Sequence, residues 1–181
     1  MKRLPIVGVM GAGAHAHEDL AVPLGRQLAR LGVHLLTGGG SGVMTSVSRA
    51  FSEVEDRAGL VIGVLPLAEA IGVPGAGEGY PHPWVEVPVR THLGKLGADT
   101  FSRNHVNVLT SDVVVALPGS SGTASEVALS IHYGRPLVLF GDLNRARDLP
   151  GTVATATSVD EVIAFVRNAL ARMGGSAPPP S

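Results

Sequence analysis

Short apolar runs alternate along the chain with segments of helical hydrophobic period. The runs hold Val, Ile, Leu and Ala without intervening polar residues, which is typical of strands that are covered on both faces of a sheet. The longer segments repeat apolar residues at helical spacing, as Leu20, Leu24 and Leu28 do. This pattern predicts strands over 6–10, 33–36, 60–65, 113–117 and 136–140, and helices over 18–31, 43–51, 100–109, 123–133 and 159–173.

Strands that alternate with helices indicate a parallel sheet, because parallel neighbours need a long crossover connection. We therefore expect an α/β fold: one Rossmann-like, doubly wound domain over residues 1–173, with a mostly parallel sheet flanked by helices. The 181 residues suit a single domain, and the segment 174–181, which is poor in apolar residues, predicts a disordered tail.

Some element boundaries are less regular than the rest. Pro23 must lie in the first turn of its helix or mark a later start, since an interior proline removes a backbone hydrogen bond. Asp99 is a candidate N-cap for the helix that follows it, and Ser158 for the last helix. Weak alternation over 84–89 predicts a further strand, and the Gly- and Pro-rich segment 67–83 predicts a long loop.

Composition and charge exclude several classes of function. The chain has no Cys, which excludes disulfides, thiolate metal sites and thiol catalysis. Its 14 basic and 15 acidic side chains give a net charge of −1, whereas nucleic-acid-binding proteins usually carry a strong basic excess. Lys2 and Lys95 are the only lysines and neither fits a P-loop, and a pyridoxal phosphate enzyme, which needs a Schiff-base lysine, is disfavoured.

No apolar segment of the sequence is long enough to span a membrane. Proline and glycines interrupt the apolar residues that follow Met1, so the sequence lacks the pattern of a signal peptide. We therefore expect a cytoplasmic protein that has neither a membrane nor a nucleic acid as its partner.

The strongest candidate site is the turn between the strand over 113–117 and the helix that follows it. Main-chain amides at the start of a helix, together with the helix dipole, bind anions such as phosphate. Glu126 lies one turn into this helix, where it would face the same ligand and suit general acid–base chemistry. The alternative is a tight turn in which Glu126 only complements the helix dipole. The residues of the turn are Pro118, Gly119, Ser120, Ser121, Gly122 and Thr123.

Two further glycine-rich turns follow predicted strands, at the edge of the sheet where such folds bind ligands. The spacing Gly8-x-x-Gly11-x-Gly13 departs from the dinucleotide fingerprint, which disfavours NAD. The second turn holds more glycines than a simple turn needs, although a strand-to-helix turn packed close to its neighbour is the alternative. The candidate ligand-binding residues in these turns are Gly11, Ala12, Gly38, Gly39, Gly40 and Gly42.

These motifs resemble those of the Lonely Guy superfamily, which was long mislabelled as lysine decarboxylases. The segment 38–44 is similar to its G-G-G-x-x-G-x-M loop, and the segment 118–126 to its P-G-G-x-G-T-x-x-E signature. The resemblance covers roughly residues 5–141. It implies hydrolysis of the N-glycosidic bond of nucleoside 5′-monophosphates, with Arg103 and Glu126 as the catalytic pair and no cofactor required.

The chain also departs from the family pattern. Thr100 stands at the position of the family Met, Asn104 at that of the Lys, and Ser120 at that of the second Gly of the signature. The stretches 102–107 and 125–129 look closer to a sister branch that includes molybdenum cofactor carrier proteins. The alternative function is therefore a non-catalytic carrier of this pterin phosphate, and a nucleotide sensor that works through assembly is a weaker one.

Both resemblances imply a small phosphate-bearing ligand, a nucleotide or a pterin, and a homodimer or homotetramer. Asn104 is a further candidate ligand-binding residue beside those of the glycine-rich turns. Without the resemblance, Arg103 is equally well explained as an arginine on the surface of a helix.

His15 and His17 lie near the ligand edge, but exposed loop histidines are the simpler explanation. The histidines form no metal-ligand motif, so no metal is expected. The choice of base is expected to depend on the unmatched segment 67–98.

Overall fold

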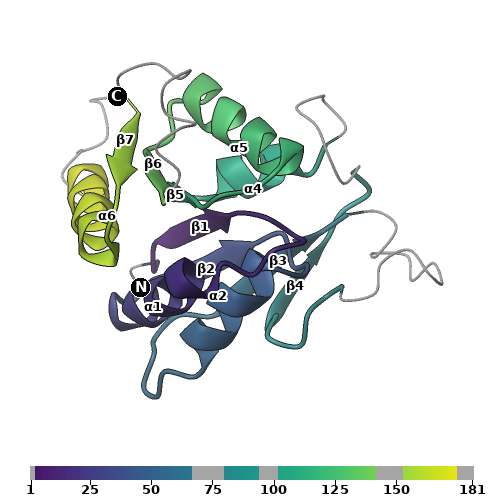
Figure 1. Cartoon of the computed structure of the whole chain (residues 1–181), viewed down its shortest axis with the longest axis horizontal. Helices are drawn as coiled ribbons and strands as arrows, with labels where there is room; N and C mark the ends of the chain where they lie inside the picture. The colour runs from purple at the N-terminus through teal and green to yellow at the C-terminus, as the bar shows by residue number, and fades with distance from the viewer. Residues whose placement is uncertain (1–2, 67–79, 94–101, 142–152, 175–181) are drawn as a thin grey trace.

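A computed structural model describes residues 3–66, 80–93, 102–141 and 153–174 of the chain. Its strands form one sheet with the order β4-β3-β2-β1-β5-β6-β7, and every neighbouring pair is parallel (Figure 1). The predicted fold class, a Rossmann-like doubly wound α/β domain, is confirmed. The strands are β1 (Ile6–Met10), β2 (His34–Thr37), β3 (Val61–Leu65), β4 (Val87–Arg90), β5 (Val113–Ala116), β6 (Leu137–Phe140) and β7 (Ala154–Ala156).

Helices cover both faces of the sheet, which explains why its central strands read as unbroken apolar runs (Figure 1). In β5, Val113 and Val115 belong to one buried cluster, whereas Val114 and Ala116 belong to the cluster on the opposite face. The first cluster includes buried residues of α1, α2 and α6, and the second includes residues of α5. The helices are α1 (Glu18–Arg30), α2 (Val43–Ser52), α4 (Asn104–Thr110), α5 (Ser121–His132) and α6 (Val159–Gly174).

The strand order places a topological switch point between β1 and β5. From β1 the chain proceeds through β2 and β3 to β4 at one edge, and then returns to β5 and continues to β7 at the other. The loops after β1 and β5 therefore leave the sheet side by side and diverge toward helices on opposite faces. In open α/β sheets this divergence leaves a crevice at the carboxyl ends of the strands, where ligands bind.

Most predicted boundaries agree with the structure to within two residues, but the starts of β4 and α4 do not. The helix begins at Asn104, with Arg103 as its N-cap, rather than at residue 100. The Ser102 hydroxyl accepts a hydrogen bond from the Asn104 amide at 3.2 Å, a local turn that competes with helix. The predicted cap Asp99 lies outside the described residues.

Pro23 lies inside α1, beyond its first turn, so the prediction for this residue is wrong. The helix begins at Glu18, and its acidic first-turn residues Glu18 and Asp19 complement the helix dipole there. The Ser158 cap is confirmed, since its hydroxyl accepts a hydrogen bond from the Glu161 amide at 3.3 Å.

The two edge strands of the sheet, β4 and β7, are the strands that the sequence pattern predicts least well. The strand predicted over 84–89 is observed as β4, and β7 was not predicted. None of the four residues of β4 is buried, and one of the three residues of β7 is, so neither strand shows a strong hydrophobic pattern. The predicted tail beyond residue 174 and most of the predicted loop, residues 67–79, lie outside the described residues.

A glycine sets the distance between α1 and α2. A Cβ atom on Gly25 would lie 2.4 Å from the backbone carbonyl oxygen of Val47, which is too close for any side chain. Gly25→Ala is therefore expected to lower the free energy of unfolding by about 1–3 kcal/mol, as overpacking does. Helix propensity alone would give the opposite sign, a gain of about 1 kcal/mol.

Denaturant unfolding of the purified variant measures this change. Arg26→Ala, at an exposed position of the same helix, is the control and is expected to stay within about 0.5 kcal/mol of the unmodified chain. Equal or greater stability of Gly25→Ala would show that the helices can separate freely.

Candidate functional site

Backbone hydrogen bonds join the three glycine-rich turns into one edge. The Ala12 amide donates to the carbonyl of Pro118 at 3.1 Å, and the Ala12 carbonyl accepts from the Val43 amide at 2.9 Å. The Ser41 hydroxyl adds a bond of 2.7 Å to the carbonyl of Gly13. The turns after β1, β2 and β5 are therefore held together at the switch point, as their positions after parallel strands predicted.

A cavity of about 200 Å³ opens at this edge. Its walls come from β1 and the turn after it, the starts of α4 and α5, and Tyr80. Of the predicted site residues it is lined by Gly11, Gly38, Arg103, Asn104, Ser120, Gly122, Thr123 and Glu126. The remaining predicted residues are in the same turns but not on the cavity wall: Ala12, Gly39, Gly40, Gly42, Pro118, Gly119 and Ser121.

In the 38–42 turn, one glycine is required by the backbone geometry and a second lies directly against a side chain. Gly42 has a φ of 66°, and a Cβ atom there would lie 2.2 Å from the Ala12 carbonyl oxygen. A Cβ atom on Gly38 would lie 2.5 Å from Nη1 of Arg103. The absence of a side chain at residue 38 therefore allows Arg103 to approach the backbone.

Arg103 is buried, with only 5% of its surface exposed, so it is not a surface helix arginine. Its Nη1 donates to the carbonyls of Gly38 and Val64, and its Nη2 donates to Tyr80 Oη at 3.4 Å. Nε is buried without a hydrogen-bond partner in the described part of the chain. Arg103 thus joins the ends of β2 and β3 through its hydrogen bonds. Its Nε donor takes no part in these bonds.

Glu126 contributes a buried carboxyl group to the cavity, with 9% of the residue exposed. Its Oε1 accepts a hydrogen bond from Nδ2 of Asn107 at 2.8 Å. Burial raises the pKa of Glu126 from 4.5 to about 7, while the Asn107 bond and the positive charge of Arg103 oppose part of this rise. Because both protonation states are populated near pH 7, this carboxyl group is suited to exchange a proton with a ligand.

The first turn of α5 faces the cavity through Ser120, Gly122 and Thr123. Amides in the first turn of a helix have no acceptor within the helix, and the helix dipole adds partial positive charge there. Thr123 is buried and contributes a hydroxyl group. This wall of the cavity is suited to an anionic ligand group, whereas the Glu126 carboxylate would repel one. We therefore expect the anionic group of a ligand to lie against the start of α5.

Tyr80 and Asn107 belong to the site but were not predicted. Tyr80 lines the cavity, and its segment is fixed to the 38–42 turn because the His82 amide donates to the carbonyl of Gly39 at 3.0 Å. Tyr80 lies in a segment without a hydrophobic period, so no sequence signal placed it. Asn107 stands three and four positions after Asn104 and Arg103, and this helical spacing could have placed it on the same face.

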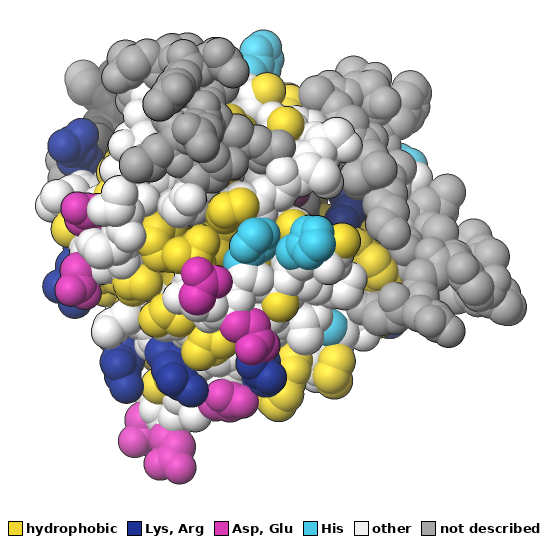
Figure 2. Space-filling view, viewed as in Figure 1, with side chains coloured by type: hydrophobic (Ala, Val, Ile, Leu, Met, Phe, Trp, Pro, Cys, Tyr) yellow, Lys and Arg dark blue, Asp and Glu magenta, His cyan; other side chains and the backbone are white. Residues whose placement is uncertain are grey.

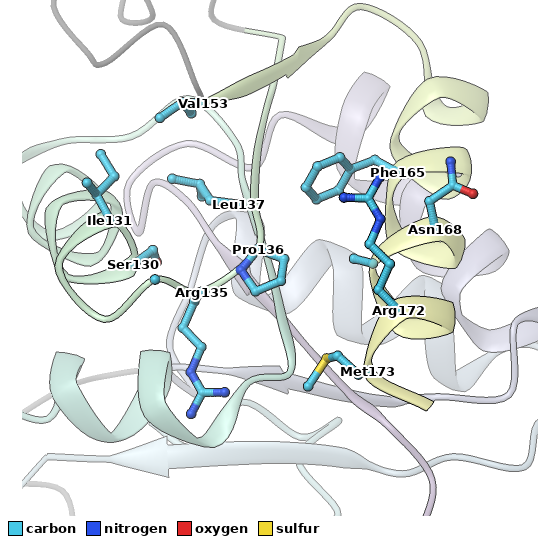
Figure 3. A pocket seen from close by; sticks show the side chains of 12 residues that line it. Ser130, Ile131, Arg135, Pro136, Leu137, Val153, Phe165, Asn168, Arg172 and Met173 are labelled. Atoms are coloured by element: carbon cyan, nitrogen blue, oxygen red, sulfur yellow. The ribbon is translucent and has the colours of Figure 1, made fainter. Parts of the chain in front are cut away.

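A larger pocket of about 630 Å³ lies between α5 and α6 (Figure 3). Arg135 and Pro136, which line it, precede β6, so it is at the amino ends of the strands, away from the glycine-rich turns. Figure 3 shows Phe165, Asn168 and Arg172 on the α6 side of this pocket. None of the predicted site residues lines it, and the smaller cavity is therefore the candidate site.

The surface adds little to the candidate chemistry. Figure 2 shows Lys and Arg side chains interspersed with Asp and Glu on the described part of one face, rather than a patch of one sign. His15 and His17 pack edge to face with ring centroids 6.1 Å apart, and neither lines the cavity.

Among the described residues no three His, Cys, Asp or Glu side chains could together hold a metal ion. No helix there is long and apolar enough to cross a membrane.

Fold and site together define a Rossmann-like α/β protein with a ligand cavity at its switch point. The chain belongs to the SLOG cluster4 family, whose model matches residues 4–168. This confirms the resemblance to the Lonely Guy superfamily.

Solved structures with this fold include two molybdenum cofactor proteins. The molybdenum cofactor binding protein of Rippkaea orientalis is 32% identical, with a TM-score of 0.77 over 94% of this chain and 99% of that one. The molybdenum cofactor carrier protein of Chlamydomonas reinhardtii is 36% identical, with a TM-score of 0.74 over 93% and 99%.

A curated relative is the cytokinin riboside 5′-monophosphate phosphoribohydrolase LOG of Oryza sativa subsp. japonica. It is 34% identical over 113 residues, which are 62% of this chain and 40% of the rice protein. The chain therefore spans less than half of the length of this relative.

The raised pKa of Glu126 gives a stability prediction. Between pH 4.5 and 7 the folded state holds a proton that the unfolded state has lost, so the free energy of unfolding falls as the pH rises through this window. Glu126→Gln removes the ionisation and keeps an oxygen for Asn107. We expect it to be more stable than the unmodified chain by about 1–3 kcal/mol at pH 8, with the difference nearly absent at pH 4.

Thermal unfolding of both chains at the two pH values measures this difference. Glu55→Gln, at an exposed glutamate, is the matched control and is expected to change neither melting curve. A Glu126→Gln chain that is less stable at pH 8 would contradict the buried, raised-pKa carboxyl group.

Proposed function

We propose that the chain binds a phosphate monoester of a nucleotide or pterin in the switch-point cavity and hydrolyses nucleoside 5′-monophosphates there. The observation that carries the proposal is the convergence of Glu126 and Arg103 on one cavity beside the first turn of α5. The family that the chain belongs to and its similarity to the rice phosphoribohydrolase support this proposal.

The walls of the cavity suggest how the ligand binds. The phosphate lies against the first turn of α5, where main-chain amides and the Thr123 hydroxyl donate to its oxygens. A volume of about 200 Å³ is below the roughly 300 Å³ of the smallest whole-ligand pockets. The phosphate and sugar therefore fill the cavity, and the base extends beyond it.

Hydrolysis breaks the bond between C1′ of the ribose and the base nitrogen. The oxygen of a water molecule bonds to C1′, and one proton of that water ends on the departing base. Positive charge develops on the ribosyl group in the transition state, and the Glu126 carboxylate stabilises it, accepts the proton of the water and passes that proton to the base nitrogen. Arg103 contributes positive charge near the phosphate and fixes the turn at Gly38. The reaction needs no cofactor.

A specific observation favours a second function, the binding of a molybdenum cofactor without turnover. The similarity to the two molybdenum cofactor proteins covers at least 93% of the chain, whereas the rice hydrolase matches 62%. In addition, Asn104 replaces the lysine of the hydrolase motif. In such a carrier the pterin phosphate occupies the same cavity, and Glu126 accepts a hydrogen bond from the pterin ring.

Incubation of the purified chain with AMP and other nucleoside 5′-monophosphates tests the hydrolase. Chromatography is expected to detect the free base and an equal amount of ribose 5-phosphate, at a rate that rises with pH through about 7 as Glu126 ionises. Glu126→Gln is expected to lower kcat by about 10²- to 10⁴-fold, the contribution typical of a general acid or base. Thr123→Val is expected to raise KM instead.

The Glu55→Gln control is expected to keep the full rate. Turnover that persists in Glu126→Gln would place the chemistry elsewhere. No release from any monophosphate, together with binding of the molybdenum cofactor that Thr123→Val weakens, would instead support the carrier.

A further inference from the structure

Asn107 is a buried polar residue that no resemblance assigns to the site. Its surface is 1% exposed, and it lies on α4 one turn after Arg103. Its backbone amide donates to the Arg103 carbonyl at 3.0 Å, and its backbone carbonyl accepts from the Ser111 hydroxyl at 2.7 Å. The main chain at Asn107 is thus fixed on both sides, while its side chain is directed at Glu126.

We propose that Asn107 is a positioning residue that holds the Glu126 carboxyl group in the orientation needed at the cavity. The inference rests on the proposed function, in which Glu126 acts on the ligand. Nδ2 of Asn107 lies 2.8 Å from Oε1 of Glu126, a short and fully buried hydrogen bond. A glutamate side chain has three rotatable bonds, and this bond fixes its end where solvent does not reach.

A second contact between the same two helices supports this arrangement. One turn earlier on α4, Nδ2 of Asn104 donates to the Ser125 hydroxyl at 3.2 Å. The two asparagine amides therefore fix the register of α4 against α5 at adjacent positions. Asn104 reaches the cavity wall itself, whereas Asn107 acts through Glu126.

The side-chain amide of Asn107 also favours the ionised form of Glu126. An N–H donor stabilises a carboxylate more strongly than a neutral carboxylic acid. Arg103 is the charged side chain in the described structure that acts on Glu126, and it favours the same ionised form. Without Asn107, desolvation would be opposed by Arg103 alone, and Glu126 would ionise only at a higher pH.

Asn107→Leu, which keeps the approximate volume and removes the donor, tests the proposal. An NMR titration that follows the side-chain carboxyl carbon of Glu126 is expected to move its midpoint to a higher pH than in the unmodified chain. This measurement does not depend on turnover. At pH 7, kcat for nucleoside monophosphates is expected to fall about 10- to 100-fold, the size of effect that misplacement of a reacting group produces, with KM nearly unchanged.

Asn107→Asp provides a second variant with the original shape, in case the leucine chain does not fold. Its added carboxyl group is expected to raise the pH at which Glu126 ionises even further, so activity is recovered only in alkaline buffer. Asn168→Leu, a matched change on α6 outside the site, is expected to alter neither the titration nor kcat.

The outcomes separate this inference from the proposed function. An unchanged Glu126 midpoint in Asn107→Leu or Asn107→Asp overturns the positioning role, whether or not the chain is a hydrolase. An unmodified chain that releases no base, with a shifted midpoint in the variants, overturns the hydrolase and leaves Asn107 as the residue that orients Glu126 toward a bound ligand.

Discussion

The parallel arrangement of all neighbouring strands is the constraint on which the site depends. It brings the carboxyl end of every strand to one edge, and the reversal of strand order between β1 and β5 opens a crevice there. The bond from the Ala12 amide to the Pro118 carbonyl joins the turns on the two sides of that crevice. Residues more than a hundred positions apart thereby form one cavity.

In and directly beside this cavity, polar groups are buried together rather than singly. Arg103, Asn107 and Glu126 are each at most 9% exposed. Burial of an unpaired charge is strongly unfavourable, and here each charged group has partners: two backbone carbonyls for Arg103 and an amide for Glu126. The Glu126 carboxyl group still ionises less readily than it would in water. The presence of this acid therefore lowers the free energy of unfolding at neutral pH.

The sequence was sufficient for the features that repeat or that require a special residue type. Unbroken apolar runs predicted β1, β5 and β6, because strands covered on both faces contain little else. Glycine-rich turns predicted the edge of the site, since Gly42 is required by a close backbone contact and a positive φ, and Gly38 lies directly against the Arg103 guanidinium. Edge strands such as β7 have few buried residues and therefore escaped the same analysis.

The partners of the site residues could not be read from the sequence in this way. The burial of Arg103 depends on carbonyls 65 and 39 positions away, and no local pattern encodes such contacts. The Asn107 contact crosses from α4 to α5 and needs the packing of both helices on the sheet. Helical spacing places Asn107 on the face of Arg103 and Asn104, but only the fold shows that Glu126 lies opposite.

The choice between turnover and simple binding depends on why residue 126 is an acid. A carrier needs at this position only an acceptor for a hydrogen bond, which glutamine would supply without a buried ionisable group. Glutamate brings desolvation that raises its pKa to about 7, and this lowers stability wherever the carboxyl group must ionise. Proton exchange near neutral pH is what the acid can do and the amide cannot. The buried acid at residue 126 is therefore the feature of this cavity that the proposed hydrolysis would use and that binding of a cofactor would not require.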